Sequence, residues 1–240
     1  MSFVIWFIFL ILYLLFNLNM HIKHVFKFKT KFNNIKILHN SKSNLFFINT
    51  TSFSFCTTPN NSSMRNITPN IEDKLNKKLY LKENHPIHII KSKITSFFSE
   101  TNRKKWSKLE NLTENKFDIH ESLPQIVSTK DCFDNLLVDK DNETRSPKNT
   151  YYVDDNSILR THMTTFDIPL IRSGNNSFIC IGDVFRRDAI DNTHYPIFHQ
   201  VDAVRLFNVE ELTKNPYSDN NNVVQIIQQD LQYCLENLIK

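Results

Sequence analysis

Two apolar runs in the second half of the chain limit its possible folds more than any other feature. They span Phe178 to Arg187 and Ile197 to Phe207, and the segment AIDNTHYP lies between them. Asp191–Asn192 is a turn signal in that segment, and Pro196 ends it. We therefore predict two strands joined as an antiparallel hairpin. The connection is longer than a tight hairpin turn, so we expect it to have a role besides reversing the chain.

The alternation of side chains along these strands predicts a polar pocket. Residues two positions apart in a strand face the same side. Arg186 and Asp188 therefore share one face, as do Phe198, Gln200 and Asp202. A guanidinium, an aromatic ring, an amide and carboxylates on one surface are unusual for a core. They are typical of a pocket that binds a charged ligand.

Other segments predict helices around the hairpin. A helix is expected to begin near His85 with Pro86 at its first position, where the missing N–H costs nothing. The charged segment Ile71–Leu81 is also predicted to be helical, and Phe133–Val138 is predicted to be a short strand. From Val223 to Leu238, apolar residues recur at helical spacing, which indicates a helix packed on the sheet.

Residues 1–71 have the composition of a targeting leader. Phe3–Leu18 is almost wholly apolar, about the length of a long signal-peptide core and slightly short for a membrane span of ~20 residues. No Asp or Glu occurs before Glu72, and the segment after Leu18 is basic and rich in Ser, Thr and Asn. We predict a disordered or helical leader that directs import into an organelle. The alternative is a permanent membrane anchor.

Charge and cysteine content argue against a nucleic-acid-binding surface, a zinc site and a disulfide framework. The chain carries a net charge of +4, but its basic excess lies in the leader, so the remainder shows no basic footprint for nucleic acid. The cysteines are far apart and form no CxxC motif, which argues against a zinc site or a disulfide framework. They are Cys56, Cys132, Cys180 and Cys234.

The segment GDVFRRDAIDNTHYPIFHQVDAVRLF, Gly182 to Phe207, closely resembles motif 2 of phenylalanyl-tRNA synthetases, above all of the single-chain mitochondrial type. HPIHIIKSKI, FDNLLV and NSILRTH resemble, in the same order, the family's HPL-containing helix, its motif 1 strand and its next signature. The resemblance covers residues 84–240. It implies an α+β fold, the class II synthetase catalytic core, with an antiparallel sheet flanked by helices. Residues 72–240 would be the N-terminal part of this domain.

This resemblance implies a phenylalanine–tRNA ligase, an enzyme of two steps. Phenylalanine first attacks the α-phosphate of ATP, which arrives with Mg²⁺, to give an adenylate and pyrophosphate. The phenylalanyl group then passes to the terminal ribose of tRNA(Phe). The expected place is organellar translation in the mitochondrial matrix, with the plastid as the alternative.

The resemblance also implies roles for single residues. Arg186 would be the catalytic residue, bridging the carboxylate of phenylalanine and the α-phosphate. ATP would contact Arg186, Asp188, Thr193, His194, Tyr195 and Phe198. Phenylalanine would contact His162, Thr164, Thr165, Phe166, Asp167, Gln200, Val201 and Asp202. No protein ligand to a metal is expected.

The sequence departs from the family pattern in two ways. Asp167 stands where the family has a glutamine, and Asp202 where it has a glutamate. The chain's only glycines are Gly174 and Gly182, so the glycine-rich third motif is absent from these 240 residues. Nor do they include the anticodon-binding domain. We therefore expect a C-terminally truncated ligase. The alternative is an inactive synthetase fragment that binds a partner chain or nucleic acid.

Overall fold

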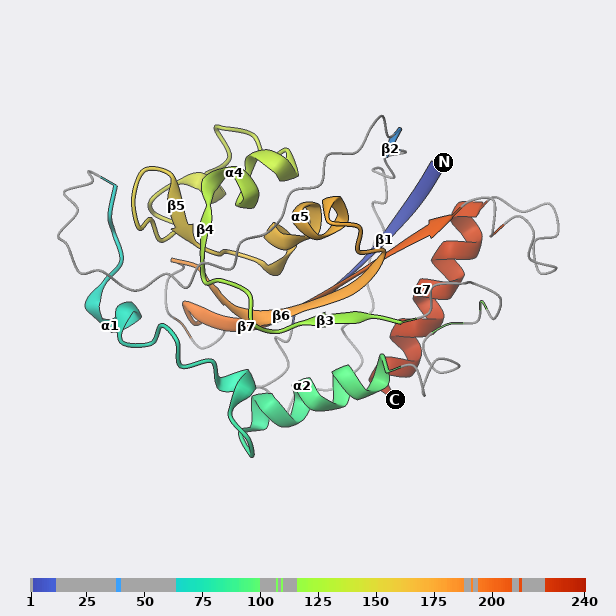
Figure 1. Cartoon of the computed structure of the whole chain (residues 1–240). Helices are drawn as coiled ribbons and strands as arrows, with labels where there is room; N and C mark the ends of the chain where they lie inside the picture. Colours follow the sequence, from blue (N-terminus) through green and yellow to red (C-terminus); the bar gives the residue numbers. More distant parts are fainter. Residues whose placement is uncertain are drawn as a thin grey trace.

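A computed structural model describes residues 2–11, 38–39, 64–99, 107, 109, 116–187, 191, 194–208, 212 and 223–240 (Figure 1). Its main sheet has five strands in the order β2-β1-β7-β6-β3. The bounds are β1 Ser2–Ile11, β2 Leu38–His39, β3 Asp118–His120, β6 Ser177–Phe185 and β7 Ile197–Asn208. All neighbouring strands are antiparallel except β3 and β6, which are parallel. The α+β class is therefore confirmed, with one parallel pair added to the expected antiparallel sheet.

A second, two-stranded sheet and several helices complete the fold. The small sheet pairs β4, Ile126–Ser128, with β5, Ser157–Leu159. Helices α2 and α7 pack on one face of the main sheet, whereas α4 and α5 lie on the other (Figure 1). The α-helices are α1 Pro69–Glu72, α2 Pro86–Phe97, α4 Thr129–Cys132, α5 Asp167–Arg172 and α7 Val223–Ile239. The 3₁₀ helices are η2 Leu79–Leu81, η4 Asp134–Leu136, η5 Glu143–Arg145 and η6 Met163–Phe166.

The predicted hairpin is present as β6 and β7. Gly182 pairs with Gln200 and Val184 with Phe198, which fixes the faces of both strands. Every residue of β6 is buried, because helices and loops cover both of its faces. This burial explains why the run reads as continuously apolar rather than as a clean alternation.

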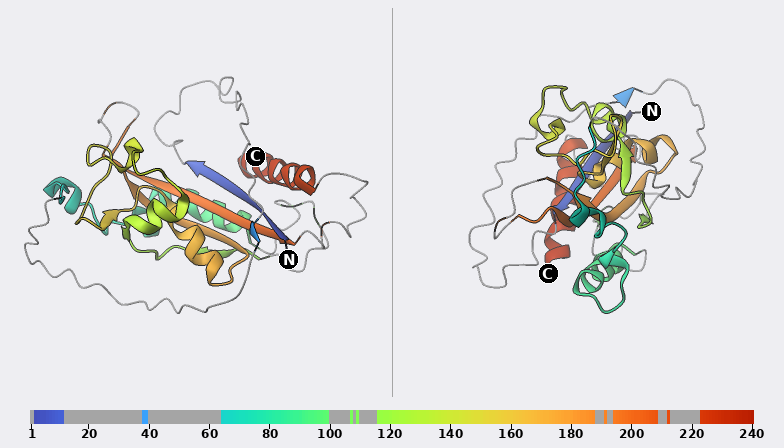
Figure 2. Two further views of the ribbon diagram at one scale, coloured as in Figure 1. Left: turned by 90° about the horizontal axis from the view of Figure 1, so that it is seen from above. Right: turned by 90° about the vertical axis from the view of Figure 1, so that its left-hand side faces the viewer.

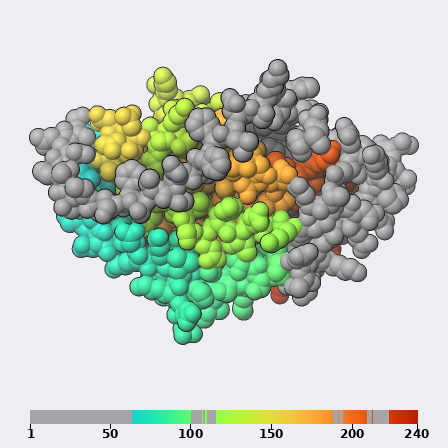
Figure 3. Space-filling view, in the orientation of Figure 1, coloured from blue at the N-terminus to red at the C-terminus, as the bar shows by residue number. Residues whose placement is uncertain are grey.

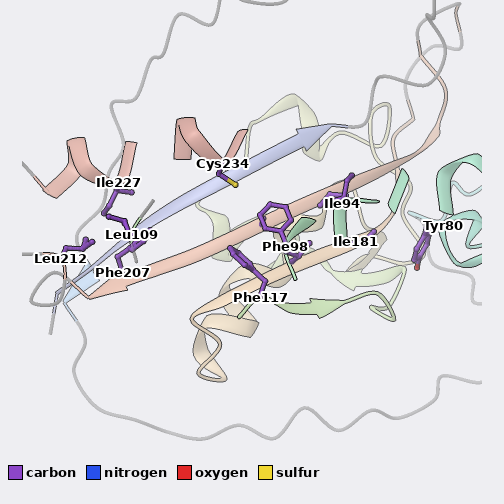
Figure 4. Close-up of a cluster of buried hydrophobic side chains, with 13 residues drawn as sticks. Tyr80, Ile94, Phe98, Leu109, Phe117, Ile181, Phe207, Leu212, Ile227 and Cys234 are labelled. Carbon is purple, nitrogen blue, oxygen red and sulfur yellow. The ribbon is translucent and has the colours of Figure 1, made fainter. Parts of the chain in front are cut away.

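The face of the sheet that carries α2 and α7 holds the larger apolar core (Figure 4). Its centre is formed by Ile179 and Ile181 of β6 with Val201, Ala203 and Phe207 of β7. The helices and loops add Tyr80, Ile94, Phe98, Leu109, Phe117, Leu212, Ile227 and Cys234. Residues 64–99, which include α2, form the lower surface of the molecule in Figure 3.

Both predicted long helices are confirmed. Helix α2 begins at Pro86, and the Nδ1 atom of His85 accepts a hydrogen bond from the amide of Ile87 at 3.2 Å. This bond satisfies one of the amides that a helix start leaves free, while Pro86 has none to satisfy. Helix α7 follows β7 and places Ile227 and Cys234 in the core.

The prediction of a strand at Phe133–Val138 is wrong. The Ser128 side chain accepts a bond from the amide of Asp131 and so starts α4, after which the chain continues into η4. Leu137 has a left-handed backbone with φ 59°, and this ends the turn. Phe133 is buried against the second core rather than in a sheet. Local capping therefore decides the structure of this short apolar run.

The segment Ile71–Leu81 is helical only near its two ends, in α1 and η2. Between them, Asn76 and Lys78 adopt positive φ angles of 62° and 40°. A left-handed residue breaks a right-handed helix, because the chain changes direction there.

The expectation of a disordered or helical leader is wrong for the two short parts that are described. The backbone of β1 pairs along β7, from Phe3 opposite Asn208 to Ile11 opposite Gln200 (Figure 2). The β1 segment is rich in β-branched and aromatic residues, which favour strands. It pairs with the side of β7 that does not pair with β6. The rest of the leader lies outside the described residues. Among the described helices, none is long and apolar enough to span a membrane.

A buried ion pair connects β7 to α7. Arg205 Nη1 and Asp230 Oδ2 are 3.4 Å apart, both side chains are almost fully buried, and Ser107 Oγ donates to Asp230 at 2.9 Å.

Asp230→Ala would leave the Arg205 charge buried without its carboxylate. We expect the free energy of unfolding to fall by about 3–5 kcal/mol in urea titrations. Gln229→Ala, one residue away on the exposed side of α7, is the control and should change it by less than about 0.5 kcal/mol. Equal stability of the two variants would contradict this role.

Candidate active site

The predicted convergence of polar side chains on one face is present. The guanidinium carbon of Arg186, just after β6, lies 5.1 Å from the centre of the Phe198 ring on β7. Its Nε donates to the carbonyl of Thr161 at 3.2 Å. Phe198, Gln200 and Asp202 alternate along β7 and face the side covered by η6 and α5. A permanent cation thus lies over an aromatic ring, at an edge where both side chains are only partly buried.

Arg160 is the residue that positions the loop above this face. Its side chain is fully buried and pairs with Asp183, Nη2 to Oδ1, at 2.7 Å. Its Nε donates to the Asp183 carbonyl at 2.6 Å, and Nη1 donates to the carbonyls of Leu123 and Pro124 at 2.9 and 3.1 Å. Gln125 donates to the other Asp183 oxygen at 2.8 Å. These bonds satisfy both buried charges and join β5 to β6.

Sequence reasoning missed the role of Arg160 and Asp183. Both occur in the segments that carry the family resemblance, NSILRTH and GDVFRRD, and each interrupts an apolar run. A charged residue within an apolar run indicates a buried pair, because a lone buried charge is too costly. The partner could not be identified, because the two residues are 23 positions apart in sequence.

Gly182 leaves the space that Arg160 occupies. A Cβ atom at this position would lie 2.9 Å from the Arg160 guanidinium carbon and 3.2 Å from the Met163 sulfur, with Nη2 closer still. Gly182 faces Gln200, whose Oε1 accepts a bond from the Met163 amide at 3.1 Å. The absence of a side chain at Gly182 therefore lets η6 and Arg160 pack directly on the sheet.

Asp167 and Asp202 form a buried acid pair. They are 1% and 2% exposed, and no hydrogen-bond partner contacts any of their four carboxylate oxygens. Burial raises the pKa of Asp167, and the nearby Asp202 carboxyl raises it further. Burial also raises the pKa of Asp202, although the Thr164 hydroxyl and the Ala203 amide lie near enough to lower it in part.

The segment that leads to the acid pair contains the other predicted amino-acid contacts. The pKa of His162 is lowered to about 4, first by burial and then by Arg186, so its ring is neutral at pH 7. Its Nε2 lies 3.7 Å from Cys132 Sγ, and its Nδ1 is buried without a partner. The Thr165 hydroxyl is also buried and unpartnered. Phe166 is buried with the Arg160 guanidinium carbon 5.8 Å from its ring centre.

Three of the predicted ligand contacts lie apart from this cluster. The Val201 side chain packs in the core on the opposite face of β7. His194 is exposed and its Nδ1 lies 2.8 Å from Asp191 Oδ2. The hydroxyl of Tyr195, also exposed, accepts a bond from Lys74 at 2.6 Å. Asp188 and Thr193 lie outside the described residues.

The acid pair is enclosed, because both side chains are almost fully buried. One open groove of about 710 Å³ runs along α2 between Asn84 and Phe97. Access to the acid pair is therefore expected from the side where Arg186, Phe198 and His162 are partly exposed. Within the described part of the chain, no group of three His, Cys, Asp or Glu side chains could hold a metal ion.

Comparison with known proteins identifies the family that this chain resembles. A family model described as the class II core domain (F) of tRNA synthetases matches residues 70–213. The mitochondrial phenylalanine–tRNA ligase of Dictyostelium discoideum is 36% identical, over 78% of this chain and 45% of its own length. The chloroplastic/mitochondrial phenylalanine–tRNA ligase of Arabidopsis thaliana is 36% identical, over 73% of this chain and 37% of its own length. The mitochondrial phenylalanine–tRNA ligase of Mus musculus is 33% identical, over 61% of this chain and 31% of its own length. The chain thus spans less than half the length of these relatives.

The space above Gly182 can be tested by filling it. Gly182→Ala would push the Arg160 guanidinium away from Asp183, and we expect a loss of about 3–5 kcal/mol in the free energy of unfolding. Gly174→Ala is the matched glycine control. Nothing lies within 4 Å of a Cβ there, but φ is +93°, so the expected cost is about 1–2 kcal/mol from backbone strain alone. If Gly182→Ala costs no more than Gly174→Ala in urea titrations, the packing role is wrong.

The acid pair predicts a pH dependence of stability. The raised pKa of Asp167 means that the folded chain holds a proton over a pH range in which the unfolded chain, with a pKa of about 3.9, has lost it. The free energy of unfolding should therefore fall as pH rises above about 4. Asp167→Asn removes this ionisation, so the variant should match the wild type near pH 4 and exceed it by about 1–3 kcal/mol at pH 8.

Urea titrations from pH 4 to 8.5 measure this difference directly. Asp155→Asn, an exposed acid, is the control and should keep the wild-type pH slope. A constant difference between Asp167→Asn and wild type at all pH values would contradict the raised pKa.

Proposed function

The chain belongs to the family of class II tRNA synthetase core domains, and on this basis we propose that it forms the phenylalanine- and ATP-binding part of a phenylalanine–tRNA ligase. Curated relatives that are 33–36% identical carry that enzyme's name. The observation that carries the proposal is the arrangement of Arg186 over Phe198, on the face of β7 that also presents Gln200 and Asp202.

The first chemical step requires a positive charge between two anions. The carboxylate of phenylalanine attacks the α-phosphate of ATP, giving phenylalanyl-adenylate and pyrophosphate, so charge repulsion and positioning dominate the barrier. Arg186 offers a planar fork of N–H donors that suits carboxylate and phosphate oxygens alike. Its Nε donates to the Thr161 carbonyl at 3.2 Å, and this bond orients the fork. In the second step the phenylalanyl group passes to tRNA(Phe).

Phe198 supplies a surface for the adenine ring. Its ring is partly exposed at the same edge as Arg186. Stacking of a base on an aromatic side chain contributes about 1–3 kcal/mol. The Mg²⁺ that accompanies ATP would be held mostly by phosphate and water oxygens, as is usual for this ion. We propose that His194, Tyr195, Asp188 and Thr193 contact ATP from the connection between the strands.

The acid pair supplies the amine side of the pocket. Carboxylates favour an ammonium ion through charge-assisted hydrogen bonds, and those of Asp167 and Asp202 have no cationic side chain paired with them among the described residues. His162 is neutral at pH 7 and does not add a competing positive charge. Gln200 holds η6 in place through Met163, so the amide both positions the loop and lines the pocket. Thr164, Thr165, Phe166 and the backbone of Val201 complete the proposed amino-acid contacts.

We assign residues 1–71 to a targeting leader and residues 72–240 to the N-terminal part of the catalytic domain. Relatives named as mitochondrial enzymes, one of them also chloroplastic, support organellar translation with tRNA(Phe) as the partner. The mitochondrial matrix is the proposed place, and the plastid is the alternative.

Phenylalanine-dependent exchange of labelled pyrophosphate into ATP tests the proposal on the 240-residue chain. We expect Arg186→Ala to lose at least about 10²-fold of the wild-type exchange rate, because a transition-state electrostatic contact is removed. Arg187→Ala is the control. Arg187 is exposed and donates to the Pro147 carbonyl at 2.7 Å, so exchange should remain near the wild-type rate.

Two results would count against the proposal. Undiminished exchange in Arg186→Ala would remove the role assigned to this residue. No exchange by the wild-type chain would favour an inactive synthetase fragment instead.

A further inference from the structure

The acid pair lacks the compensation that buried charges normally have. Asp167 lies at the start of α5 and Asp202 in the middle of β7, and both side chains are almost fully buried. Within the part of the chain that the structure describes, neither carboxyl takes part in an ion pair, and Asp167 has no hydrogen-bond donor, whereas the Thr164 hydroxyl and the Ala203 amide lie near Asp202. A third buried polar group, the Thr165 hydroxyl on the same turn, is also unpartnered. Such a cluster is costly unless a ligand or a proton satisfies it.

The surrounding cations are already engaged elsewhere. Arg160, from the end of β5, is bonded to Asp183 and to backbone carbonyls. Arg186 is bonded to the Thr161 carbonyl and lies over Phe198. Neither is oriented to neutralise the acid pair.

The remaining titratable groups around the pair are neutral at pH 7. Burial lowers the pKa of His162, on the loop before η6, and of His120 on β3. The thiols of Cys132 on α4 and Cys180 on β6 have pKa values raised by burial, and the acid pair raises that of Cys180 further. The two carboxyls therefore lie near enough to act on each other's ionisation, with no positive charge paired to either of them.

Two neighbouring carboxyls in such a place cannot both carry a full charge. Each ionised carboxylate disfavours the ionisation of the other, and the low dielectric of a buried site strengthens the effect. One proton shared by the pair removes one charge and provides an O–H donor for the other carboxylate.

We propose that the free protein holds one proton on the Asp167–Asp202 pair, and that the ammonium group of an incoming amino acid displaces this proton to solvent. The inference rests on the proposed function and adds a proton linkage to it. Before binding, one carboxyl is neutral and one is ionised. After binding, both are ionised around one ammonium ion, and no covalent bond to the amino acid changes.

The linkage sets a requirement on the ligand. A protonated amine brings the positive charge that stabilises the second carboxylate, and it also donates three hydrogen bonds to oxygens that now have none. An amino acid whose nitrogen is acylated is neutral there and cannot displace the proton. The pair thus selects a free α-amine, and does so better as pH rises toward neutrality.

Titration calorimetry of the 240-residue chain with phenylalanine at pH 7, in buffers of different ionisation enthalpy, measures the protons released. We expect about one proton per bound phenylalanine for the wild type and for the exposed-acid control Asp155→Asn. Asp167→Asn leaves a single carboxylate and should release close to none. N-acetylphenylalanine should bind to none of these chains.

Infrared spectroscopy of the ligand-free chain provides a second readout that needs no bound amino acid. A carbonyl stretch from a protonated carboxyl should be present at pH 7, be lost in Asp167→Asn, and persist in Asp155→Asn. If Asp167→Asn does not fold, Asp202→Asn serves in both measurements.

The outcomes separate this inference from the proposed function. Binding without proton release, together with no such infrared band, would overturn the inference and leave the amino-acid site in place. No binding of phenylalanine by the wild type would overturn the proposed site and the displacement step, and the infrared band would then decide whether the proton is held at all.

Discussion

The pairing of Arg160 with Asp183 is the interaction on which the site depends. It is buried, it satisfies three backbone carbonyls as well as one carboxylate, and it lies directly over Gly182. Because the next residues after Arg160 are those of the proposed amino-acid pocket, the same bonds that join β5 to β6 also fix where His162 and η6 begin. A buried pair of this kind contributes little net stability, but the loss of either partner would leave the other charge buried and uncompensated.

Strand β7 contributes apolar side chains to the core on one face of the sheet and polar side chains to the proposed site on the other. On the side of α2 and α7, Val201, Ala203 and Phe207 pack in an apolar core, and Arg205 is neutralised by Asp230. On the other side, Gln200 accepts a bond from the Met163 amide, whereas Asp202 is buried with no positive charge paired to it among the described residues. The core side can hold the strand rigidly, and this rigidity allows the opposite side to keep polar groups in an unfavourable but defined position.

The acid pair is the clearest case of a cost in stability that function can explain. Its carboxyls would be more favourably placed in water or beside a cation, and their raised pKa values express this. A cationic ligand relieves the cost on binding, so part of the affinity comes from the unfavourable free state. With Asp167 the site holds two carboxyls, and this cost is larger than that of one carboxyl beside a neutral amide.

The sequence alone determined the hairpin, the start of α2 at Pro86, the helix from Val223, and the shared face of Phe198, Gln200 and Asp202, because these depend on local periodicity and caps. It also indicated the family, through the contiguous segment from Gly182 to Phe207. It did not determine that Phe133–Val138 would turn rather than extend, that Arg160 would pair with Asp183, or that the two acids would lie together without partners. These features depend on contacts between residues far apart in the chain, and on how much water each contact excludes, which only the packed tertiary structure decides.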